Sequence, residues 1–286
     1  MWTSNTLGEY ELLDASDGER LERWGKYLLI RPDPQIIWKG IRKSPLWKKA
    51  DARYSRSSTG GGSWDIKKLP DKWNVRVGEF TFLIKPMGFK HTGVFPEQAA
   101  NWEWSGNLIK NAGRPISVLN LFAYTGGATV ACAKAGASVV HVDAAKNMVA
   151  QAKTNMALNG LENAHCRYIV DDCEKFVARE IRRGNRYDAI IMDPPSYGRG
   201  PGGEVWKLED NIFSFLTEAV KLMSDDPLFF LINSYTTGLS GSTMAYMLSA
   251  LSANRGGRVE ADELGIKVSS SNMCLPCGAS ARCVFN

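Results

Sequence analysis

The segment Asp193-Pro-Pro-Ser-Tyr197 has residue types that could hold a base for chemistry at one of its nitrogen atoms. Two prolines remove two backbone donors and fix φ, which leaves a carboxylate and carbonyl oxygens as acceptors in a cleft. These acceptors would orient a nitrogen lone pair toward a methyl donor, and the Tyr197 ring would stack on the base. Transfer from a sulfonium needs alignment more than acid–base help. Catalytic roles are predicted for Asp193, Pro194, Pro195 and Tyr197; the competing interpretation is a simple Pro-Pro turn.

Residues 118–129 have the pattern of a buried strand, a glycine turn and the start of a helix. Gly126 and Gly127 let the backbone pass close to a ligand, and the helix that follows offers free N–H groups. Asp143 stands 17 residues after Gly126, close to the spacing at which an acid accepts hydrogen bonds from ribose hydroxyls. Together they predict a nucleotide-type cofactor site, although glycine turns are common and strand-end acids often cap helices.

The same segment disfavours cofactors that carry a pyrophosphate. A dinucleotide fingerprint would need a third glycine about where Thr129 stands, and the Gly-Lys-Ser/Thr of a P-loop is missing. A nucleoside cofactor without phosphates therefore fits better. Asp171 and Asp172 end a later predicted strand, where a carboxylate could hold an adenine amino group. Asp172 could instead cap the helix that follows.

From about residue 101 the sequence alternates strands and helices, as in a parallel sheet covered on both faces. Strands are predicted at 116–122, 138–143, 166–170, 187–193, 228–233, 258–264 and 279–285. Helices are predicted at 128–135, 145–159, 173–183, 208–223 and 242–253. Asn159-Gly160 suits a left-handed cap at the end of the second helix. Ligands bind such sheets at the carboxyl ends of the strands, where the polar and glycine-rich motifs fall.

The first hundred residues lack this alternation of strands and helices. Short apolar pieces at 27–31, 36–38, 75–77 and 80–84 are separated by Pro, Gly and charged stretches, which indicates a small β-rich module. Residues 55–63 have the composition of a flexible loop. We therefore expect a β-rich module over 1–100 and an α/β domain over 101–286.

Three stretches resemble the motifs of one enzyme family: Lys90-His-Thr-Gly-Val-Phe-Pro-Glu-Gln98, then 120–127 with Asp143-Ala-Ala-Lys146 and Asn155-Met-Ala-Leu-Asn-Gly160, and finally 193–197. Residues 75–286 resemble the class I S-adenosylmethionine-dependent methyltransferases of the large-subunit ribosomal RNA methyltransferase I/K-like family. The resemblance implies a Rossmann-like α/β fold, with a doubly wound, mostly parallel seven-stranded sheet behind the β-rich module. It also implies S-adenosylmethionine as cofactor, with 92–98 packed over it. The implied cofactor-binding residues are Phe95, Gln98, Phe122, Ala123, Tyr124, Thr125, Gly126, Gly127, Asp143, Ala144, Asp172, Cys173 and Asp193.

The sequence departs from the family pattern in three places. No RNA-binding domain of the PUA kind is recognisable, and Ala99 replaces the final Arg of the first motif. Asn233-Ser-Tyr-Thr-Thr-Gly238 has no cysteine where cytosine-C5 members of the family carry one. Methylating carbon 5 of a pyrimidine needs a nucleophile, normally a thiolate, to attack C6, and hydroxyls are poor substitutes. We therefore predict methylation of a nitrogen rather than a carbon.

The charge distribution points to a nucleic-acid substrate. Of the formal +5, all the excess is N-terminal: residues 1–100 hold 17 Lys and Arg against 12 Asp and Glu, and the rest hold 18 of each. Within 38–56, Lys43, Lys48 and Lys49 are predicted to bind phosphates of RNA, most simply ribosomal RNA. The alternative is a solvated face whose tryptophans anchor the module. The glycine-rich stretch 198–206 is predicted to be a substrate loop, with Arg199 and Trp206 as contacts, or merely a flexible loop.

The expected activity is S-adenosylmethionine-dependent methylation of a base nitrogen in ribosomal RNA. Two alternatives stay open: the same fold acting on a small molecule or protein, and a non-enzymatic protein that binds S-adenosylmethionine or RNA. No run of 18 apolar residues and no signal pattern occurs, so we expect a cytoplasmic protein without a membrane partner. Cys274-Leu-Pro-Cys277 lacks a second ligand pair, so no metal is expected. The sequence is compatible with a homodimer but does not determine the oligomeric state.

Overall fold

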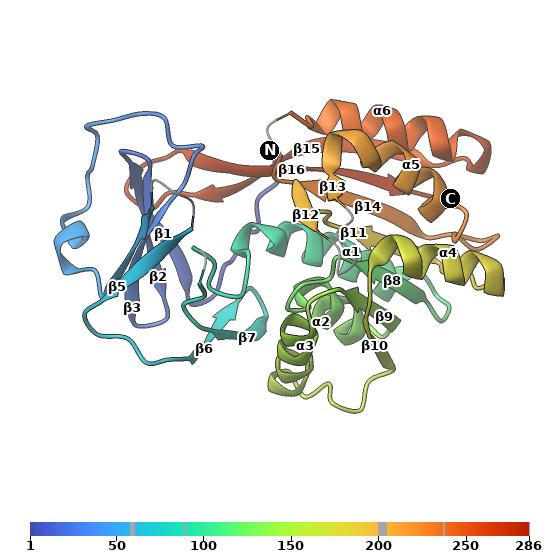
Figure 1. Cartoon of the computed structure of the whole chain (residues 1–286), viewed down its shortest axis with the longest axis horizontal. Helices are drawn as coiled ribbons and strands as arrows, with labels where there is room; N and C mark the ends of the chain where they lie inside the picture. Colours follow the sequence, from blue (N-terminus) through green and yellow to red (C-terminus); the bar gives the residue numbers. More distant parts are fainter. Residues whose placement is uncertain (58–60, 89, 200–204, 237, 286) are drawn as a thin grey trace. The chain divides into compact units, whose positions relative to one another are not determined.

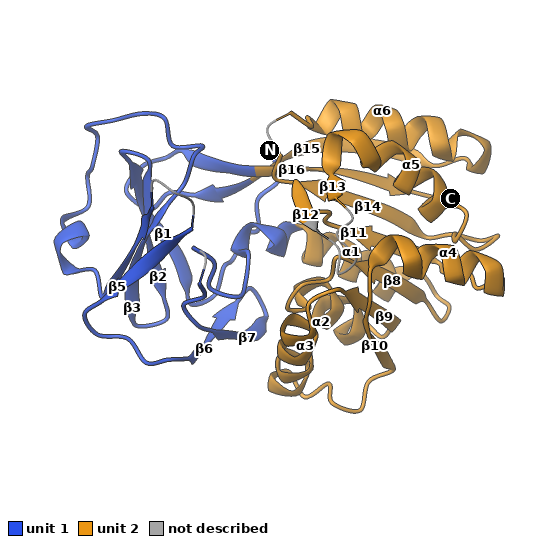
Figure 2. Ribbon diagram, viewed as in Figure 1, with its two compact units in different colours: residues 1–100, 265–277 blue, residues 101–264, 278–286 orange. Residues whose placement is uncertain are grey.

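The computed structural model describes residues 1–57, 61–88, 90–199, 205–236 and 238–285 (Figure 1). The chain divides into two compact units (Figure 2). Unit 1 comprises Met1–Ala100 and Gly265–Cys277, and unit 2 comprises Asn101–Leu264 and Gly278–Asn286. Unit 1 thus takes a segment from late in the chain, which the expected boundaries assign to the second domain.

Unit 2 is built on a seven-stranded sheet with the strand order β10-β9-β8-β11-β14-β16-β15. The strands from β10 to β14 are parallel, and β16 runs antiparallel to β14. The prediction of a doubly wound, mostly parallel sheet is therefore confirmed. The strands are β8 Ser117–Leu121, β9 Ser138–Asp143, β10 Cys166–Val170, β11 Ala189–Met192, β14 Phe229–Ser234, β15 Arg258–Lys267 and β16 Cys274–Val284.

Helices cover both faces of this sheet (Figure 1). Helices α2 and α3 pack against each other on one face, and α1 lies against α2, where Trp102 faces Gly127. Helices α4, α5 and α6 cover the other face. Their bounds are α1 Ala99–Asn111, α2 Gly127–Lys134, α3 Lys146–Leu158, α4 Cys173–Arg183, α5 Leu208–Val220 and α6 Gly241–Ser252.

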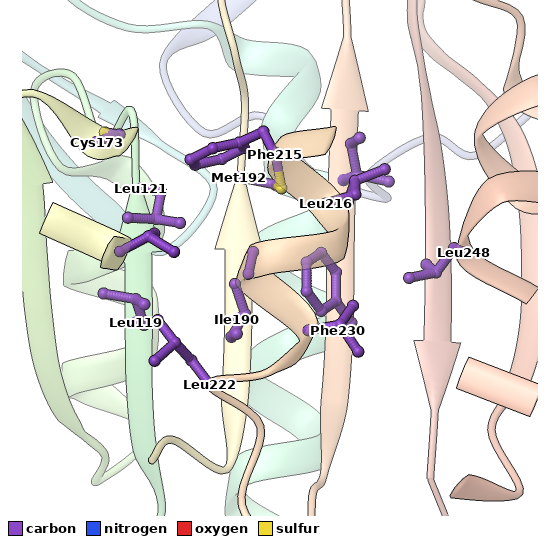
Figure 3. Packing of buried hydrophobic residues seen from close by; sticks show 14 of the residues in the cluster. Leu119, Leu121, Cys173, Ile190, Met192, Phe215, Leu216, Leu222, Phe230 and Leu248 are labelled. Carbon is purple, nitrogen blue, oxygen red and sulfur yellow. The ribbon is translucent and has the colours of Figure 1, made fainter. Parts of the chain in front are cut away.

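An apolar cluster of unit 2 lies between the sheet and helices α4 to α6 (Figure 3). Alternate residues of a strand point to one face, so Leu119 and Leu121 of β8 share this face with Ile190 and Met192 of β11. Phe215 of α5 packs over them. Each of these side chains is almost fully buried, and burial of one such side chain contributes about 1.5–3 kcal/mol. This cluster fixes where the strands end, and thereby where the polar residues after them lie.

Unit 1 contains a five-stranded sheet in the order β1-β2-β3-β4-β5 and a separate β6–β7 pair. These strands pair antiparallel, except for β3 and β4, which pair in parallel. The prediction of a β-rich module is therefore confirmed. Its late segment holds the turn between β15 and β16, where Ser270 Oγ donates to Asp14 Oδ1 at 2.8 Å. The strands are β1 Tyr10–Ser16, β2 Glu19–Trp24, β3 Tyr27–Pro32, β4 Ala52–Arg56, β5 Gly62–Ile66, β6 Trp73–Val77 and β7 Phe80–Ile84.

Several local predictions differ from the structure. Residues 36–38 form no strand, because the Trp38 indole donates to the backbone oxygen of Ala15 and holds the segment as a loop. The stretch 55–63 belongs in part to β4 and β5, and 58–60 lie outside the described residues. Helix α1 was not predicted. The left-handed cap after α3 is confirmed, since Gly160 has φ 67°.

Candidate active site

The topology of unit 2 brings two predicted motifs to the same edge of the sheet. Residues 122–127, the cofactor loop, follow β8, and Asp193 follows β11, the neighbouring strand. The chain order reverses between them, because β8 leads to β9 and β10 on one side while β11 leads to β14 on the other. Ligands of doubly wound sheets bind outside the carboxyl ends of strands at such a switch point. The candidate site therefore lies at the ends of β8 and β11.

The cofactor loop has a strained backbone. Phe122 (φ 53°) and Tyr124 (φ 50°) lie in the left-handed region, as does Gly126 (φ 82°). This region costs a residue with a Cβ about 1–2 kcal/mol. Part of the restraint comes from α3, where Asn155 Nδ2 donates to the backbone oxygen of Thr125 at 2.8 Å. Strain that is imposed by surrounding structure clusters at ligand sites, which agrees with the predicted role of this loop.

Both glycines of the loop are required by packing within unit 2. A Cβ on Gly126 would lie 2.9 Å from the Cβ of Ala152 in α3. A Cβ on Gly127 would lie 2.5 Å from the ring of Trp102 in α1. The sequence analysis explained these glycines by close approach to a ligand. The structure adds a second reason, because they let α1, α2 and α3 come together behind the loop.

Asp143 ends β9 and ties the cofactor loop to the next turn. Its Oδ2 accepts from the Tyr124 N–H at 2.8 Å, and its Oδ1 accepts from the Ala145 N–H at 2.8 Å. Burial raises the pKa of Asp143, and these two backbone bonds partly offset the rise. Ala144 follows on the surface. Each carboxylate oxygen has a second lone pair, so Asp143 can also accept from ribose hydroxyls.

Asp172, at the end of β10, caps helix α4: its Oδ1 accepts from the Lys175 N–H at 2.9 Å. The capping interpretation of Asp172 is therefore correct, and its contact with adenine stays a prediction. Asp171 forms an ion pair with Arg179 of the same helix. That pairing directs Asp171 to α4, which leaves Asp172 as the better placed of the two carboxylates.

Cys173 connects helix α4 with the cofactor loop. Its Sγ accepts a hydrogen bond from the Phe122 N–H at 3.3 Å, and its side chain is buried. Burial raises the pKa of the Cys173 thiol, so it stays protonated near neutral pH. Ala123 donates its N–H to the backbone oxygen of Val142 at 3.0 Å, which continues the β8–β9 ladder into the loop. Both predicted cofactor residues thus hold the loop in place.

The turn 193–197, the Asp-Pro-Pro turn, is held by residues at the end of β14 and just after it. Asn233 Nδ2 donates to Asp193 Oδ1 at 2.9 Å, and the hydroxyls of Ser196 and Thr236 share a hydrogen bond at 2.5 Å. The Tyr197 side chain is 53% exposed, so its ring is available for stacking. The turn thus carries an acid held by a hydrogen bond and an exposed aromatic ring, and the catalytic roles of Asp193 and Tyr197 stay predictions.

Trp206, predicted to contact the substrate, instead packs within unit 2. Its Nε1 donates to the backbone oxygen of Pro195 at 2.6 Å, and its ring lies 5.7 Å from that of Phe122 and 5.8 Å from that of Phe215. The expectation that both prolyl carbonyls are free was therefore wrong for Pro195. Trp206 joins the Asp-Pro-Pro turn to the cofactor loop, and any substrate contact would be additional.

The glycine-rich stretch begins and ends as paired strands. β12 Tyr197–Arg199 and β13 Val205–Lys207 are antiparallel neighbours. Residues 200–204 and the side chain of Arg199 lie outside the described part of the structure, so the predicted contact through Arg199 stays a prediction. The paired strands show that the loop is anchored at both ends directly after the Asp-Pro-Pro turn.

Phe95 and Gln98 belong to unit 1, where Phe95 precedes and Gln98 ends the short 3-10 helix η2 Pro96–Gln98. Both side chains are half-buried, and the Phe95 ring lies 5.2 Å from that of His91. Burial lowers the pKa of His91 to about 4, so this ring is neutral at physiological pH. The cofactor contacts of Phe95 and Gln98 stay predictions.

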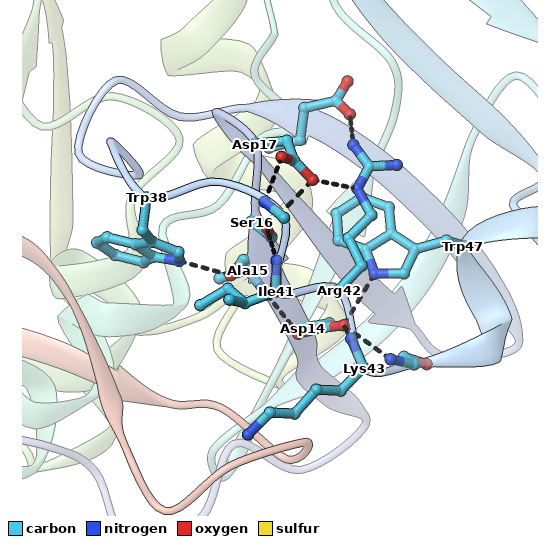
Figure 4. A network of polar contacts seen from close by, with 12 residues as sticks. Asp14, Ala15, Ser16, Asp17, Trp38, Ile41, Arg42, Lys43 and Trp47 are labelled. Atoms are coloured by element: carbon cyan, nitrogen blue, oxygen red, sulfur yellow. Dashed lines mark hydrogen bonds and ion pairs between the residues drawn. The ribbon is translucent and has the colours of Figure 1, made fainter.

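The basic segment 38–56 of unit 1 is anchored by a polar network (Figure 4). Asp14 Oδ2 accepts from the Trp47 indole at 2.9 Å and from the backbone N–H groups of Lys43 and Ser44 at 2.7 and 2.8 Å. The Arg42 guanidinium lies 4.1 Å from the centre of the Trp47 ring. The tryptophans therefore anchor the module, as the alternative interpretation of this segment expects.

The lysines of this segment face solvent. Lys43, Lys48 and Lys49 are exposed, and none forms an ion pair with the part of the chain that the structure describes. In Figure 4 the Lys43 side chain extends away from the network. Arg42, in contrast, is paired with Asp17 and Glu19 at 2.8 Å. The network thus fixes the backbone of the segment that carries these three exposed lysines.

A buried polar chain supports the cofactor loop from behind. Asn120 Nδ2 donates to Thr129 Oγ1 at 2.9 Å, and Thr129 Oγ1 lies 2.9 Å from His141 Nδ1. Among the described residues, His141 Nε2 has no hydrogen-bond partner. Burial lowers the pKa of His141 to about 4 from its ordinary 6.5. Protonation of His141 is therefore disfavoured in the folded protein.

We expect His141 to make folding stability depend on pH in the acidic range. The unfolded chain binds a proton at about pH 6.5, whereas the folded chain does so only near pH 4. The contribution is complete above pH 6.5 and is lost as the pH falls toward 4, by roughly 2–3 kcal/mol. Urea unfolding of His141→Asn should show a smaller loss over this range than the wild type. His165→Asn, at an exposed position, should keep the wild-type slope. Equal slopes in all three proteins would contradict the prediction.

The described residues were compared with what a metal site and a membrane span require. No group of three or more His, Cys, Asp or Glu residues that could hold a metal ion occurs among the described residues. Within the same part of the chain, no helix is both long and apolar enough to cross a bilayer.

Comparison with known proteins identifies the class to which this fold and site belong. The sequence model of the S-adenosylmethionine-dependent methyltransferases matches residues 51–215, which include the cofactor loop and the Asp-Pro-Pro turn. The chain belongs to the S-adenosylmethionine-dependent methyltransferase family. The crystal structure of a SAM-dependent methyltransferase from Agrobacterium tumefaciens is 36% identical in sequence, with a TM-score of 0.93 over 99% of this chain and 92% of that one.

Curated relatives are similar over a shorter stretch. Ribosomal RNA large subunit methyltransferase K/L of Shewanella baltica is 34% identical over 145 residues, which is 50% of this chain and 20% of that protein. Ribosomal RNA large subunit methyltransferase I of Shewanella denitrificans is 36% identical over 107 residues, 37% of this chain and 26% of that protein. The matched part thus spans about a fifth to a quarter of these relatives.

The residues of unit 2 fit the family's cofactor. The strained loop with Gly126 and Gly127 gives a backbone cradle, and Asp143 offers acceptors at the end of the adjacent strand. Asp172 ends the strand after that. Bound S-adenosylmethionine would supply an electrophilic methyl group on a sulfonium. Its adenosine would be held by these carboxylates and by the loop.

Proposed function

We propose that this methyltransferase modifies a nitrogen atom of a base in RNA, with ribosomal RNA as the substrate. The observation that carries the proposal is the position of the Asp-Pro-Pro turn, at the switch point and beside the cofactor loop of the same unit. The relatives that are named as ribosomal RNA large subunit methyltransferases support this substrate class. Because the chain spans only part of their length, the substrate remains a proposal for this chain.

The chain's own residues would position the acceptor base. The Asp193 carboxylate, whose Oδ1 also accepts from Asn233, and the carbonyl of Pro194 would accept hydrogen bonds from N–H groups of the base. The exposed ring of Tyr197 would stack on the base. Pro195 acts differently, because its carbonyl is held by Trp206 and fixes the turn. Alignment of the nitrogen lone pair with the methyl group supplies most of the catalysis.

The thiols of the chain support nitrogen over carbon as the acceptor. Ser234 at the end of β14 and Thr236 just after it offer hydroxyls, whereas attack on C6 of a pyrimidine needs a stronger nucleophile. Cys173 is the thiol beside the cofactor loop, and burial raises its pKa, which disfavours the reactive thiolate. A nitrogen acceptor with a lone pair needs no such group.

Transfer of a labelled methyl group tests the proposed function. Purified protein and S-adenosylmethionine with a labelled methyl group are incubated with total RNA, protein and metabolites from a cell that lacks this gene. We expect label in ribosomal RNA, and mass spectrometry of the nucleosides should show an N-methylated base. Label in protein or a metabolite would contradict the substrate, and 5-methylcytosine would contradict the nitrogen. Calorimetry with S-adenosylmethionine shows separately whether the cofactor binds.

We expect the exposed lysines of unit 1 to contribute to RNA affinity. Reversing Lys43, Lys48 and Lys49 to glutamate should weaken binding and flatten its salt dependence, because fewer counterions are released. The slope of log affinity against log salt should fall by about 0.7 for each lost phosphate contact. Binding to ribosomal RNA fragments at several salt concentrations measures both. Reversal of three other exposed lysines gives the same net charge and should leave the slope nearly unchanged; these are Lys110, Lys134 and Lys153. Equal slopes in the two triple variants would exclude a specific role.

A further inference from the structure

A buried chain of hydrogen bonds within unit 2 connects Arg282 to Asp193. Arg282 Nε and Nη2 both donate to Asn101 Oδ1, at 3.0 and 2.7 Å. Asn101 Nδ2 donates to Ser280 Oγ at 3.0 Å, and Ser280 Oγ donates to Asn233 Oδ1 at 2.7 Å. Asn233 Nδ2 then donates to Asp193 Oδ1 at 2.9 Å. This chain of hydrogen bonds starts in β16, passes through α1, returns to β16 at Ser280, continues through β14 and ends at the Asp-Pro-Pro turn.

The direction of every bond in this chain follows from its first member. A guanidinium can only donate, so Asn101 must turn its carbonyl oxygen toward Arg282 and its NH₂ group toward Ser280. Ser280 accepts that bond, and its single hydroxyl proton goes to Asn233 Oδ1. Asn233 is then left with its NH₂ group toward Asp193. Burial lowers the pKa of Arg282 to about 10, so the guanidinium stays charged at neutral pH.

Burial makes this direction hard to change. Ser280 and Asn233 are 0% exposed, Asn101 is 3% exposed and Arg282 is 8% exposed. An amide that turned over would oppose donor to donor or acceptor to acceptor without water to relieve it, and an unsatisfied buried polar group costs about 1–3 kcal/mol. Each of the two asparagines therefore has one orientation only.

We propose that Arg282, Asn101, Ser280 and Asn233 are positioning residues that keep Asp193 an acceptor of fixed orientation. The proposal rests on the proposed function of Asp193 as the group that orients the base. Because Asn233 presents a donor, it holds the Asp193 carboxylate as an acceptor in one orientation, the orientation in which it would meet the acceptor base. A charge at Arg282, far from Asp193 in the sequence, thereby sets the hydrogen-bonding character of the catalytic turn.

Asn101→Asp separates this role from a purely structural one. An aspartate of the same shape still accepts from Arg282, so the connection between β16 and α1 is kept. It cannot donate to Ser280, whose hydroxyl must then donate to residue 101 instead. Asn233 would turn its NH₂ group toward Ser280 and its oxygen toward Asp193, so two acceptors would face each other. A structural connection would tolerate this reversal, whereas a positioning role would not.

Methyl-transfer kinetics and amide NMR test the proposal. We expect kcat to fall by about 10- to 100-fold in Asn101→Asp with KM for RNA nearly unchanged, because alignment and not binding is lost. Asn107→Asp adds the same charge to the exposed face of α1 and should retain the wild-type kcat. Ser280→Ala removes the central hydroxyl without adding charge and should lower kcat in the same direction. Wild-type kcat in both Asn101→Asp and Ser280→Ala would overturn the proposal.

A second measurement needs no RNA, so it stays informative if the proposed function fails. The side-chain amide signal of Asn233 is recorded in the complex with S-adenosylhomocysteine. In the wild-type background, Asp193→Asn should move this signal, because Asn233 donates to Asp193. In the Asn101→Asp background the same substitution should move it much less. An equal response in both backgrounds would show that the hydrogen bonds from Arg282 to Asn233 do not set the direction of the bond between Asn233 and Asp193.

Discussion

Replacing Asp193 by asparagine is expected to lower kcat for methyl transfer by about 10²- to 10³-fold, the effect of removing one preorganised hydrogen-bonding group from an active site. Asn233 donates to one oxygen of Asp193, so the new side chain must turn its own oxygen toward Asn233. Its NH₂ group then occupies the place of the acceptor oxygen. A donor would face the N–H of the base, and the base would lose its alignment.

Single-turnover transfer of labelled methyl groups to unmodified ribosomal RNA measures this effect. Calorimetry with S-adenosylhomocysteine shows whether cofactor binding is kept, since Asp193 is also a predicted cofactor contact. Asp225→Asn removes the same charge from an exposed loop of unit 2 and should behave as the wild type. If Asp193→Asn transferred methyl groups at the wild-type rate, Asp193 would not orient the acceptor.

The sheet of unit 2 could be predicted because its strands are short apolar runs that end in polar or glycine residues. β9, β10 and α4 occur at their predicted bounds. Helix α1 could not be predicted, because its buried face carries Asn101 and Ser105 as well as apolar residues. Those polar side chains interrupt the helical repeat of apolar positions on which a sequence prediction depends. They are buried because they are satisfied: Asn101 bonds to Arg282 and Ser280 of β16, and the Ser105 hydroxyl donates to the backbone oxygen of Asn101 within α1.

Unit 1 was harder to predict for a similar reason. β2 contains Glu22, which looks like a surface residue in the sequence but is fully buried. Arg31 of β3 donates to both of its oxygens, at 2.6 and 2.7 Å, and the Tyr10 hydroxyl donates to it at 2.8 Å. Pairing of this kind depends on neighbours across the sheet. A pattern that treats charge as exposure therefore misses β1 and β2.

The candidate site was predictable where the topology alone determines it. The ends of parallel strands meet at one edge, so the loop after β8 and the turn after β11 had to be neighbours once the sheet was correct. The hydrogen bond from Arg282 to Asn101 joins residues 181 positions apart, and no local sequence pattern indicates such a bond. The contact of Trp206 with Pro195 was missed because a glycine-rich composition indicates mobility and not packing.

Gly126→Ala is expected to destabilise unit 2 by about 2–5 kcal/mol, through two separate costs. The left-handed φ of 82° costs a residue with a Cβ about 1–2 kcal/mol. Overpacking against Ala152, whose Cβ would be 2.9 Å away, costs about 1–3 kcal/mol more. Because the residue lies in the cofactor loop, affinity for S-adenosylhomocysteine should fall about tenfold or more. Gly106→Ala, in helix α1, where the new Cβ would make an ordinary contact of 4.0 Å with the Ala135 Cβ, should stabilise by about 0.5–1 kcal/mol.

A double-mutant cycle with Ala152→Gly divides these two costs. Ala152→Gly alone should destabilise by about 1 kcal/mol or more, since it places a glycine inside helix α3. In Gly126→Ala/Ala152→Gly the collision is removed while the left-handed φ remains, so the two substitutions should cost less together than separately by about 1–2 kcal/mol. Urea unfolding gives this coupling, and calorimetry with S-adenosylhomocysteine should show a partial return of affinity. Strict additivity would assign the whole requirement for Gly126 to its backbone conformation, and close packing of α3 against the loop would then play no part.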